Sequence, residues 1–464
     1  MAATATLFDN VLIGGRSGAD LYNRIFVVSA YGGMTDLLLE NKKTGAPGVH
    51  GRFVIDDNDG WRNAMDDVRR AMHERNAAMF VRPESRAEAD AFVDQRIAAV
   101  TACLDDLASL RSHGRFCVKE QLMTVRELLA GIGEAHSAHS TSLLLRDRDV
   151  NARFVDLTWD QDDLGSLDAR IRGAFAAIDL TTTLPIVTGY AGCEGGMVRR
   201  YARGYTEMTF SRIAVLTGAR EAIIHKEFHL SSADPKLVGE GKARKIGRTN
   251  YDVADQLANL GMEAIHPGAG RGLRQSGIPL RVRNTFDRED AGTLVTGDYV
   301  SDVPRVEIVT GLRQMQALIF FEQDMVGVKG YDAAILDALT RHKLWIVSKS
   351  SNANTITHYL SASAAAVNAA VTELRDRYPD ASITAQPVAM VSVIGSDISR
   401  PGLVPDALRA LDEAGVPMIA MQHQIRNVDV QFLVAPHDFD AAVRALHKAL
   451  VEDETAPAED RRAA

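Results

Sequence analysis

Residues 24–33 read RIFVVSAYGG, a short apolar run rich in β-branched residues that ends on two glycines. A continuous apolar run that meets glycines predicts a buried parallel strand. Further strand-like runs at 153–157, 184–189 and 221–225 alternate with helical patterns. Alternating strands and helices predict a mostly parallel sheet covered by helices, so residues 1–300 are expected to form an α/β domain.

Helical patterns fill the sequence between these strands. Apolar residues recur at helical spacing along two faces between residues 61 and 110, and residues 118–147 and 208–217 also have a helical pattern. Residues 287–304 are polar and contain glycine and proline, so we expect the first domain to end there.

The C-terminal third carries an internal repeat with a period of 72 residues. A shift by this period places, without a gap, Gly330 on Gly402, Leu336 on Leu408, Leu339 on Leu411, Leu344 on Val416, Ile346 on Met418, Ile356 on Val428, Leu360 on Phe432, Val371 on Val443 and Leu374 on Leu446. The shared pattern is helix, strand, turn, strand, helix. A further strand is expected before each copy, near 305–310 or 317–321 and at 389–394. Fixed-period similarity predicts a duplicated βαββα module, here at 305–380 and 386–452.

Composition excludes several classes of protein. The net charge of −9 is spread along the chain, which argues against a nucleic-acid partner or an anionic membrane surface. No apolar run approaches the ~20 residues of a membrane span, and the N-terminus lacks a signal-peptide pattern. Three widely spaced cysteines predict reduced thiols in a cytoplasmic protein. The charged residues 453–464 predict a disordered tail.

Several motifs resemble those of the aspartate kinases. Residues 27–38, VVSAYGGMTDLL, resemble that family's Val-Val-Ser-Ala-x-x-Gly-x-Thr-(Asp/Asn)-x-Leu block. The resemblance continues in order through further short motifs, namely Gly133-Glu134, RGYTE at 203–207, ADP at 233–235, His266-Pro267 and residues 287–294. Residues 224–235 and 247–255 resemble the aspartate kinases associated with ectoine biosynthesis.

This resemblance implies a fold and a reaction. The fold would be an amino-acid-kinase three-layer sandwich with a mostly parallel sheet, followed by two ferredoxin-like βαββαβ ACT modules. The reaction would transfer the γ-phosphoryl group of ATP, with Mg²⁺, to the side-chain carboxylate of L-aspartate. Such a transfer needs no covalent enzyme intermediate, so the protein must hold two anions together and stabilise charge on the moving phosphoryl group.

The resemblance also implies which residues bind aspartate. Arg203 fits a bidentate grip on the substrate α-carboxylate, and Glu134 fits a partner for its ammonium group. A glutamate in the first turn of a helix is the simpler alternative for Glu134. Ser29 and Thr35 flank the glycine turn after the first strand, where hydroxyls suit an anion or, alternatively, cap a helix.

Three further positions complete the expected substrate site. Gly204 and Thr206 are expected to bind substrate, and Glu207 is expected to act with Arg203 in catalysis. Many relatives have Ser and Asp where this chain has Thr206 and Glu207. Threonine keeps the hydroxyl, whereas glutamate places its carboxylate one methylene further out.

Residues 225–236 resemble the nucleotide-binding segment of the family. The expected ATP-binding residues are His225, Lys226, Ser231, Lys236 and Glu263. Relatives often have lysine where this chain has Glu263, so we hypothesise that Lys226 partly supplies the missing cation in phosphate binding.

The turns of the two modules are the expected effector sites. Lys349, Asn352 and Asn354 lie in the first of these turns and Asn427 in the second. The resemblance implies an amino-acid effector there and a homodimer or higher homo-oligomer. His136 and His139 lie three residues apart on a predicted helix, but without a third ligand a structural role is favoured over a metal site.

One family motif is absent from the sequence. Aspartate kinases carry Lys-x-Gly-Gly-Thr-Ser after their first strand, and nothing ahead of Val27 matches it, since the glycines at Gly14 and Gly15 lack the lysine. Either the natural start lies upstream or activity has been lost, and little kinase activity is expected of the chain as written. Two other readings stay open, a non-catalytic amino-acid sensor and a kinase for another acidic amino acid.

Overall fold

The computed structural model describes residues 6–41, 44–55, 60–113, 119–158, 165–201, 204–262 and 264–452. The chain divides into two compact units. Unit 1 comprises residues 1–222, 268–278 and 285–289, and unit 2 comprises residues 223–267, 279–284 and 290–464. The expected tail at 453–464 lies outside the described residues, and the domain boundaries expected from the sequence stay predictions.

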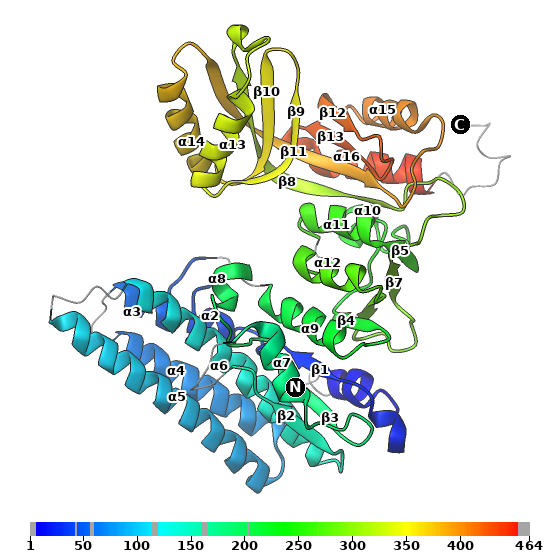
Figure 1. The fold of residues 1–464 in the computed structure, drawn as a ribbon. Coiled ribbons are helices and arrows are strands. Elements are labelled where there is room, and N and C mark those ends of the chain that lie inside the picture. The colour runs from blue at the N-terminus through cyan, green and yellow to red at the C-terminus, as the bar shows by residue number, and fades with distance from the viewer. Residues whose placement is uncertain are drawn as a thin grey trace. The chain divides into compact units, whose positions relative to one another are not determined.

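Unit 1 is built, within the described ranges, on a parallel sheet of three strands in the order β1-β3-β2 (Figure 1). These are β1 (Phe26–Val28), β2 (Ala152–Val155) and β3 (Leu184–Thr188). Every residue of the central strand β3 is buried, because helices cover both faces. The three strands predicted from apolar runs in this region are therefore confirmed.

Three long helices run side by side in unit 1: α4 (Gly60–Met79), α5 (Pro83–Ser112) and α6 (Lys119–Arg146) (Figure 1). Pro83 at the first position of α5 divides the helical pattern of residues 61–110 into two helices. Every residue of α6 from 129 to 145 is buried, and α6 contacts β2 and β3 directly. The shorter helical segments are η1 (Phe8–Ile13), η2 (Gly18–Leu21), α2 (Met34–Leu38), α3 (Val49–Ile55), α7 (Leu167–Phe175), α8 (Met197–Tyr201) and α9 (Tyr205–Leu216).

A smaller sheet precedes the repeat. Among the described residues it has the order β4-β6-β7-β5, with β4 (Ala222–Lys226), β5 (Arg248–Asn250), β6 (Leu280–Asn284) and β7 (Thr293–Thr296). Between β4 and β6 in the sequence lie the helices α10 (Pro235–Val238), α11 (Tyr251–Asn259) and α12 (Pro267–Gln275). Residues 268–275 of α12 belong to unit 1. The polar composition of residues 287–304 gave no indication of β7, which pairs parallel to β5 and antiparallel to β6.

The repeat forms an antiparallel sheet in unit 2, with the order β12-β13-β11-β8-β10-β9 across the described residues. Its strands are β8 (Ile308–Phe321), β9 (Trp345–Ser351), β10 (Thr355–Ser361), β11 (Ser382–Ile394), β12 (Met418–His423) and β13 (Asp429–Val434). Its helical segments are η3 (Gln323–Met325), α13 (Tyr331–Arg341), α14 (Ala364–Arg377), α15 (Leu403–Glu413), η4 (Pro436–Asp438), α16 (Phe439–His447) and η5 (Lys448–Glu452).

The 72-residue period is present in this part of the structure. A shift by 72 residues carries α13 onto α15. Gly330 and Gly402, which precede these helices, both have the left-handed backbone that glycine adopts without strain, with φ of 108° and 82°. The predicted duplication is thus seen in the helices as well as in the sequence. We call the two copies module 1 and module 2.

The long strands β8 and β11 each belong to both modules (Figure 1). Residues 316–321 of β8 pair with β10, and residues 389–394 of β11 pair with β13. Module 1 therefore has the strand order β11-β8-β10-β9, and module 2 has the order β8-β11-β13-β12. The two alternatives predicted from the sequence for the first strand, 305–310 and 317–321, largely fall within one continuous strand.

Among the described residues, no helix has both the length and the apolar character that crossing a bilayer requires.

Candidate active site

Three polar side chains of unit 1 meet beyond the carboxyl ends of β1 and β3. Ser29 follows β1, Glu134 lies in α6, and Thr206 lies in the first turn of α9. The Thr206 hydroxyl donates to Glu134 Oε1 at 2.7 Å, and the Ser29 hydroxyl donates to the same oxygen at 3.4 Å. The two hydroxyl oxygens are 3.1 Å apart. The fold therefore brings together three predicted substrate-binding residues that are far apart in the sequence.

Glu134 is the electrostatic centre of this group. The residue is 2% exposed, and burial raises its pKa to about 8, against the lowering effects of the Thr206 hydroxyl, the Tyr190 backbone and the Ser29 hydroxyl. Its second oxygen, Oε2, is buried without a hydrogen-bond partner. A buried carboxyl group with an open oxygen and a raised pKa is typical of a functional site. The alternative of a first-turn glutamate is wrong, because α6 begins at Lys119.

Two glycines let these elements approach closely. A Cβ on Gly189, just after β3, would lie 2.4 Å from Thr206 Cγ2 and 2.8 Å from Glu134 Oε2. A Cβ on Gly133 would lie 2.9 Å from the Cβ of Ala30. Sequence reasoning missed Gly189 as a site residue, although a glycine that closes a buried apolar run was the available signal.

The other predicted substrate residues lie in neighbouring turns of unit 1. Thr35 is half-buried in the first turn of α2, and within the described ranges no hydrogen bond joins its hydroxyl to Glu134. Gly204 is the N-cap of α9, and its carbonyl accepts from Met208 N at 3.1 Å. Glu207 is half-buried in the first turn of α9. Arg203 lies outside the described residues.

The predicted nucleotide residues belong to unit 2. His225 and Lys226 end strand β4. Burial lowers the pKa of His225 to about 4, with Arg283 acting in the same direction, so its imidazole is neutral at pH 7. Its buried Nδ1 has no hydrogen-bond partner. Lys226 is half-buried beside it.

The two remaining described nucleotide residues follow this strand. The Ser231 hydroxyl donates to Ala233 O at 2.7 Å, which tightens the local turn. Lys236 is exposed in α10, and its backbone N donates to the Asp234 side chain at 2.9 Å. The fifth predicted residue, Glu263, lies outside the described residues.

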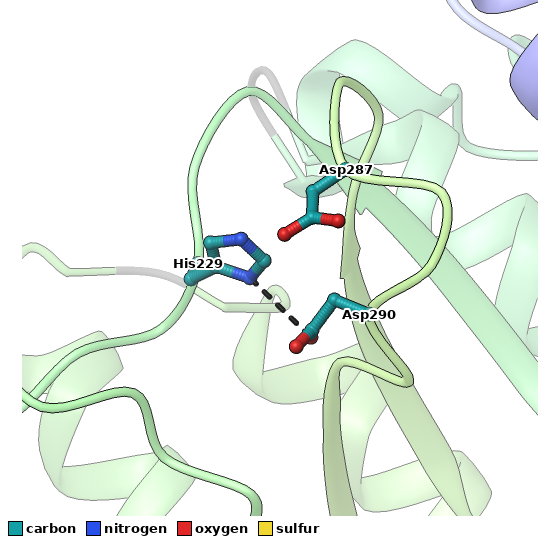
Figure 2. Close-up of side chains that lie close together, drawn as sticks. All are labelled: His229, Asp287 and Asp290. Atoms are coloured by element: carbon teal, nitrogen blue, oxygen red, sulfur yellow. Dashed lines mark ion pairs between the residues drawn. The ribbon is translucent and has the colours of Figure 1, made fainter.

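His229 and Asp290 form an ion pair close to this segment. His229 Nδ1 lies 3.5 Å from Asp290 Oδ1 (Figure 2). Lys245 also contacts Asp290, and this hydrogen bond is the main reason that the pKa of the carboxyl group is lowered. Asp287, also drawn in Figure 2, is part of unit 1. The sequence gave no sign of this pair, because its members lie on separate segments without a shared motif.

Three of the four predicted effector residues, all asparagines, lie in turns of the two modules and shape the backbone there. The prediction that Lys349 lies in the first turn is wrong, because Lys349 belongs to strand β9 and pairs with His358 of β10. Asn352 Oδ1 accepts from Asn354 N at 3.2 Å, and Asn354 O accepts from Glu322 N at 3.0 Å. Asn427 has a left-handed backbone with φ of 52°. These residue types favour such turns, so turn geometry accounts for all three.

Lys349, the remaining predicted effector residue, belongs to a polar group in module 1 that sequence reasoning missed. Its ammonium group donates to Asp332 Oδ2 at 2.7 Å. Asp332 Oδ1 lies 3.9 Å from Nε2 of His358, a fully buried residue whose two ring nitrogens lack hydrogen-bond partners. The 72-residue shift places Val404, Met421 and Val430 at the equivalent positions of module 2.

His136 and His139 have structural partners within α6 and its neighbours. His136 Nε2 lies 2.8 Å from Asn76 Oδ1, and the His139 ring stacks on Phe92 at 4.0 Å. Burial lowers the pKa of His136 to about 3 and that of His139 to about 4, so both rings are neutral. These contacts account for both histidines.

Comparisons with known proteins agree with this architecture. Residues 15–284 match the model of the amino acid kinase family. The chain is 48% identical over 456 residues to aspartate kinase Ask_Ect of Stutzerimonas stutzeri. The match covers 98% of this chain and 96% of that protein.

Solved structures show the same fold along nearly the whole chain. Escherichia coli aspartokinase III in complex with lysine and aspartate has a TM-score of 0.71 at 18% identity and covers 97% of this chain and 98% of that one. Clostridium acetobutylicum aspartate kinase has a TM-score of 0.68 at 16% identity and covers 97% and 96%. The predicted fold class is therefore confirmed. With the family model and the relative of 48% identity, these findings show that the chain belongs to the amino acid kinase family and, within it, to the aspartate kinases.

Proposed function

We propose that the chain transfers the γ-phosphoryl group of ATP to the side-chain carboxylate of L-aspartate, giving 4-phospho-L-aspartate. The observation that carries this proposal is Glu134, a buried acid with one open oxygen beside two hydroxyls. The ammonium group of an amino acid is a partner that would satisfy this oxygen. The resemblance of residues 224–235 and 247–255 to ectoine-associated aspartate kinases supports a place in ectoine biosynthesis.

Each residue of this site has a simple role in the proposed reaction. Glu134 Oε2 accepts from the substrate ammonium, and Arg203 grips the α-carboxylate. The Ser29 and Thr206 hydroxyls hold the Glu134 carboxyl group in place. The substrate side-chain oxygen then attacks the γ-phosphorus, and ADP leaves without an enzyme-bound intermediate.

Mg²⁺ fits the oxygen donors of this region. Glu207, in the same turn of α9 as Thr206, would supply a carboxylate oxygen, and the ATP phosphates would supply most of the others. When bound, the ion neutralises charge that develops on the moving phosphoryl group. Arg203 and Glu207 are accordingly the proposed catalytic residues.

On the nucleotide side, we propose that Lys226 contributes to phosphate binding together with His225, Ser231 and Lys236. Lys226→Ala is expected to raise the KM for ATP, and the exposed Lys329→Ala serves as a control of equal charge change. An unchanged KM for ATP in an active Lys226→Ala protein would show that the assignment is wrong.

A hydroxamate assay on the full chain, with ATP and either L-aspartate or L-glutamate, tests the function as a whole. Product from aspartate supports the proposal. Product from glutamate alone would assign the chain to another acidic substrate. An absence of product from both acids, in a folded protein, would agree with the low activity expected without the Lys-x-Gly-Gly-Thr-Ser motif and with a non-catalytic amino-acid sensor. The same assay on a protein extended at its N-terminus by that motif separates these two readings.

We also propose that module 1 rather than module 2 holds an amino-acid effector. Asp332, Lys349 and His358 give module 1 a polar group with unsatisfied atoms. An effector ammonium could replace Lys349 at the Asp332 carboxylate, whereas the apolar equivalents in module 2 offer no such partner.

Thermal shifts with L-lysine and L-threonine test this assignment. Asp332→Ala is expected to abolish the stabilisation by an effector, and Asp337→Ala, an exposed change on the same helix, is expected to preserve it. Equal stabilisation of the two variants would contradict the assignment.

A homodimer or higher homo-oligomer and a cytoplasmic location stay predictions. Sedimentation velocity at several protein concentrations would measure the oligomeric state. A monomer at all concentrations would overturn the first prediction.

A further inference from the structure

Ser232, in the proposed nucleotide segment, is hydrogen-bonded to the end of module 2. Its Oγ lies 2.8 Å from His447 Nε2, and His447 Nδ1 lies 3.0 Å from Glu452 Oε1. Ser232 is 1% exposed and His447 is fully buried. His447, at the end of α16, therefore contacts Ser232, which lies more than 200 positions earlier in the chain.

The partners of His447 determine where its proton lies. Burial lowers its pKa, Glu452 acts in the opposite direction, and Arg244 and Lys242 act in the same direction as burial, so the ring is neutral at pH 7. The Glu452 carboxylate only accepts, which places the proton on Nδ1 and leaves Nε2 to accept from the Ser232 hydroxyl. Ser232 Oγ in turn accepts from Arg244 N at 2.9 Å. Each polar atom in this chain of hydrogen bonds is thus satisfied.

This connectivity is that of a hydrolytic Ser-His-acid triad, but its location is different. Ser232 is buried, and its backbone is bonded on both sides. Its N donates to Arg244 O at 2.7 Å, and its O accepts from Val309 N at 2.7 Å. A buried hydroxyl held in this way is suited to fixing the chain rather than to attacking a substrate.

The segment around Ser232 is part of the core of module 2. Ala233 and Val238 pack in one apolar cluster with Leu446 and Leu450, which flank His447. Ser231 and Lys236, two of the proposed ATP ligands, lie one and four residues from Ser232. The position of these ligands therefore depends on how Ser232 is held.

We propose that His447 is a positioning residue for ATP binding: it fixes Ser232 and thereby holds Ser231 and Lys236 in their binding positions. This inference rests on the proposed nucleotide role of residues 225–236. It predicts an effect on ATP binding with no matching effect on aspartate binding, because the aspartate residues lie on other segments.

Steady-state kinetics of His447→Ala and His447→Gln test the inference. His447→Ala is expected to raise the KM for ATP about fivefold to tenfold, the range that one lost buried hydrogen bond gives, and to leave the KM for aspartate within about twofold. Glutamine can accept from Ser232 and donate to Glu452, so it should recover most of the affinity. The control is His437→Ala, a histidine of the same module whose side chain is 81% exposed.

A double variant shows whether His447 acts through Ser232. Ser232→Ala combined with His447→Ala is expected to raise the KM for ATP no more than the larger single change. Independent, multiplying effects would overturn the inference. So would an unchanged KM for ATP in His447→Ala while Lys226→Ala or Ser231→Ala raises it. If those two ligand variants also leave it unchanged, the nucleotide assignment itself has failed.

The pH dependence supplies a readout that does not require the alanine variant to fold. Protonation of His447 removes the acceptor for Ser232. Because burial lowers the pKa of His447 from its ordinary 6.5, the wild-type KM for ATP is expected to rise as the pH falls below 6.5, and to rise more than that of His447→Gln. The charged groups that face the ring, Glu452, Arg244 and Lys242, are present in both proteins. Parallel pH profiles would overturn the inference.

Discussion

Relative to the wild type, the Glu134→Gln protein is expected to become more stable but less active as the pH rises. Burial raises the pKa of Glu134 to about 8 from its ordinary 4.5. Below pH 4.5 the group is protonated in both the folded and the unfolded chain. Between the two pKa values only the unfolded chain releases the proton, so stability is lost as pH rises through 8.

The size of this effect follows from the two pKa values. Each pH unit in this window costs about 1.4 kcal/mol, which integrates to about 3 kcal/mol between pH 5.5 and 8. Glutamine has no proton to release. The unfolding free energy of Glu134→Gln minus that of the wild type is therefore expected to grow by about 3 kcal/mol over this range, whatever constant packing cost the amide brings.

Activity is expected to follow the ionised carboxylate. With a pKa of about 8, Glu134 is roughly 3% ionised at pH 6.5 and half ionised at pH 8, so the wild-type kcat/KM for aspartate should rise about 15-fold. Glu134→Gln should lack this rise and fall about tenfold to a hundredfold below the wild type at pH 8, because a charge-assisted hydrogen bond is lost.

Urea unfolding and ADP-coupled kinetics at pH 5.5, 6.5, 7.25 and 8 measure both effects. Glu88→Gln, at a side chain that is 54% exposed, is the matched control and should show neither. A stability difference between Glu134→Gln and wild type that does not change with pH would refute the reasoning. So would a wild-type kcat/KM for aspartate that is flat between pH 6.5 and 8.

Three further substitutions separate site geometry from stability. Gly189→Ala forces a Cβ within 2.4 Å of Thr206 and is expected to lower kcat/KM for aspartate more than tenfold, and wild-type kinetics would contradict the close approach. Thr206→Val removes the 2.7 Å hydrogen bond to Glu134 and should cost about tenfold in kcat/KM, whereas Thr206→Ser should retain most activity. Asn76→Ala removes buried hydrogen bonds, including the one to His136, and should lower the unfolding free energy by about 2–4 kcal/mol in urea titrations without changing either KM.

The sequence predicted the elements of the regulatory region but not how they are shared. The 72-residue period was visible because apolar residues at the same spacing build the same helices and strands twice. The joint use of β8 and β11 was not, because it depends on pairing between residues 308–312 and 390–394. Backbone hydrogen bonds between two strands that are far apart in the sequence leave no local pattern in either strand.

At the candidate site, motif residues were predicted and single residues were missed. Ser29, Glu134 and Thr206 lie in short motifs, and the fold brings them together. Gly189 and His358 each lie at the end of or inside an apolar run, where one residue does not disturb the pattern. Their role arises from what the neighbouring elements place beside them.

The shared strands also govern how the chain can be cut and recombined. Gly311 on β8 approaches the backbone of β11 so closely that a Cβ would lie 1.9 Å from Met390 O, so the two strands depend on each other's backbone at this point. A gene segment that begins at residue 386 would leave the partner strand of module 2 behind, and one that ends at 380 would do the same to module 1. Grafting this region onto another enzyme, or exchanging it between relatives, should therefore require residues 305–452 as one piece, together with the segment around Ser232 that packs in the core of module 2.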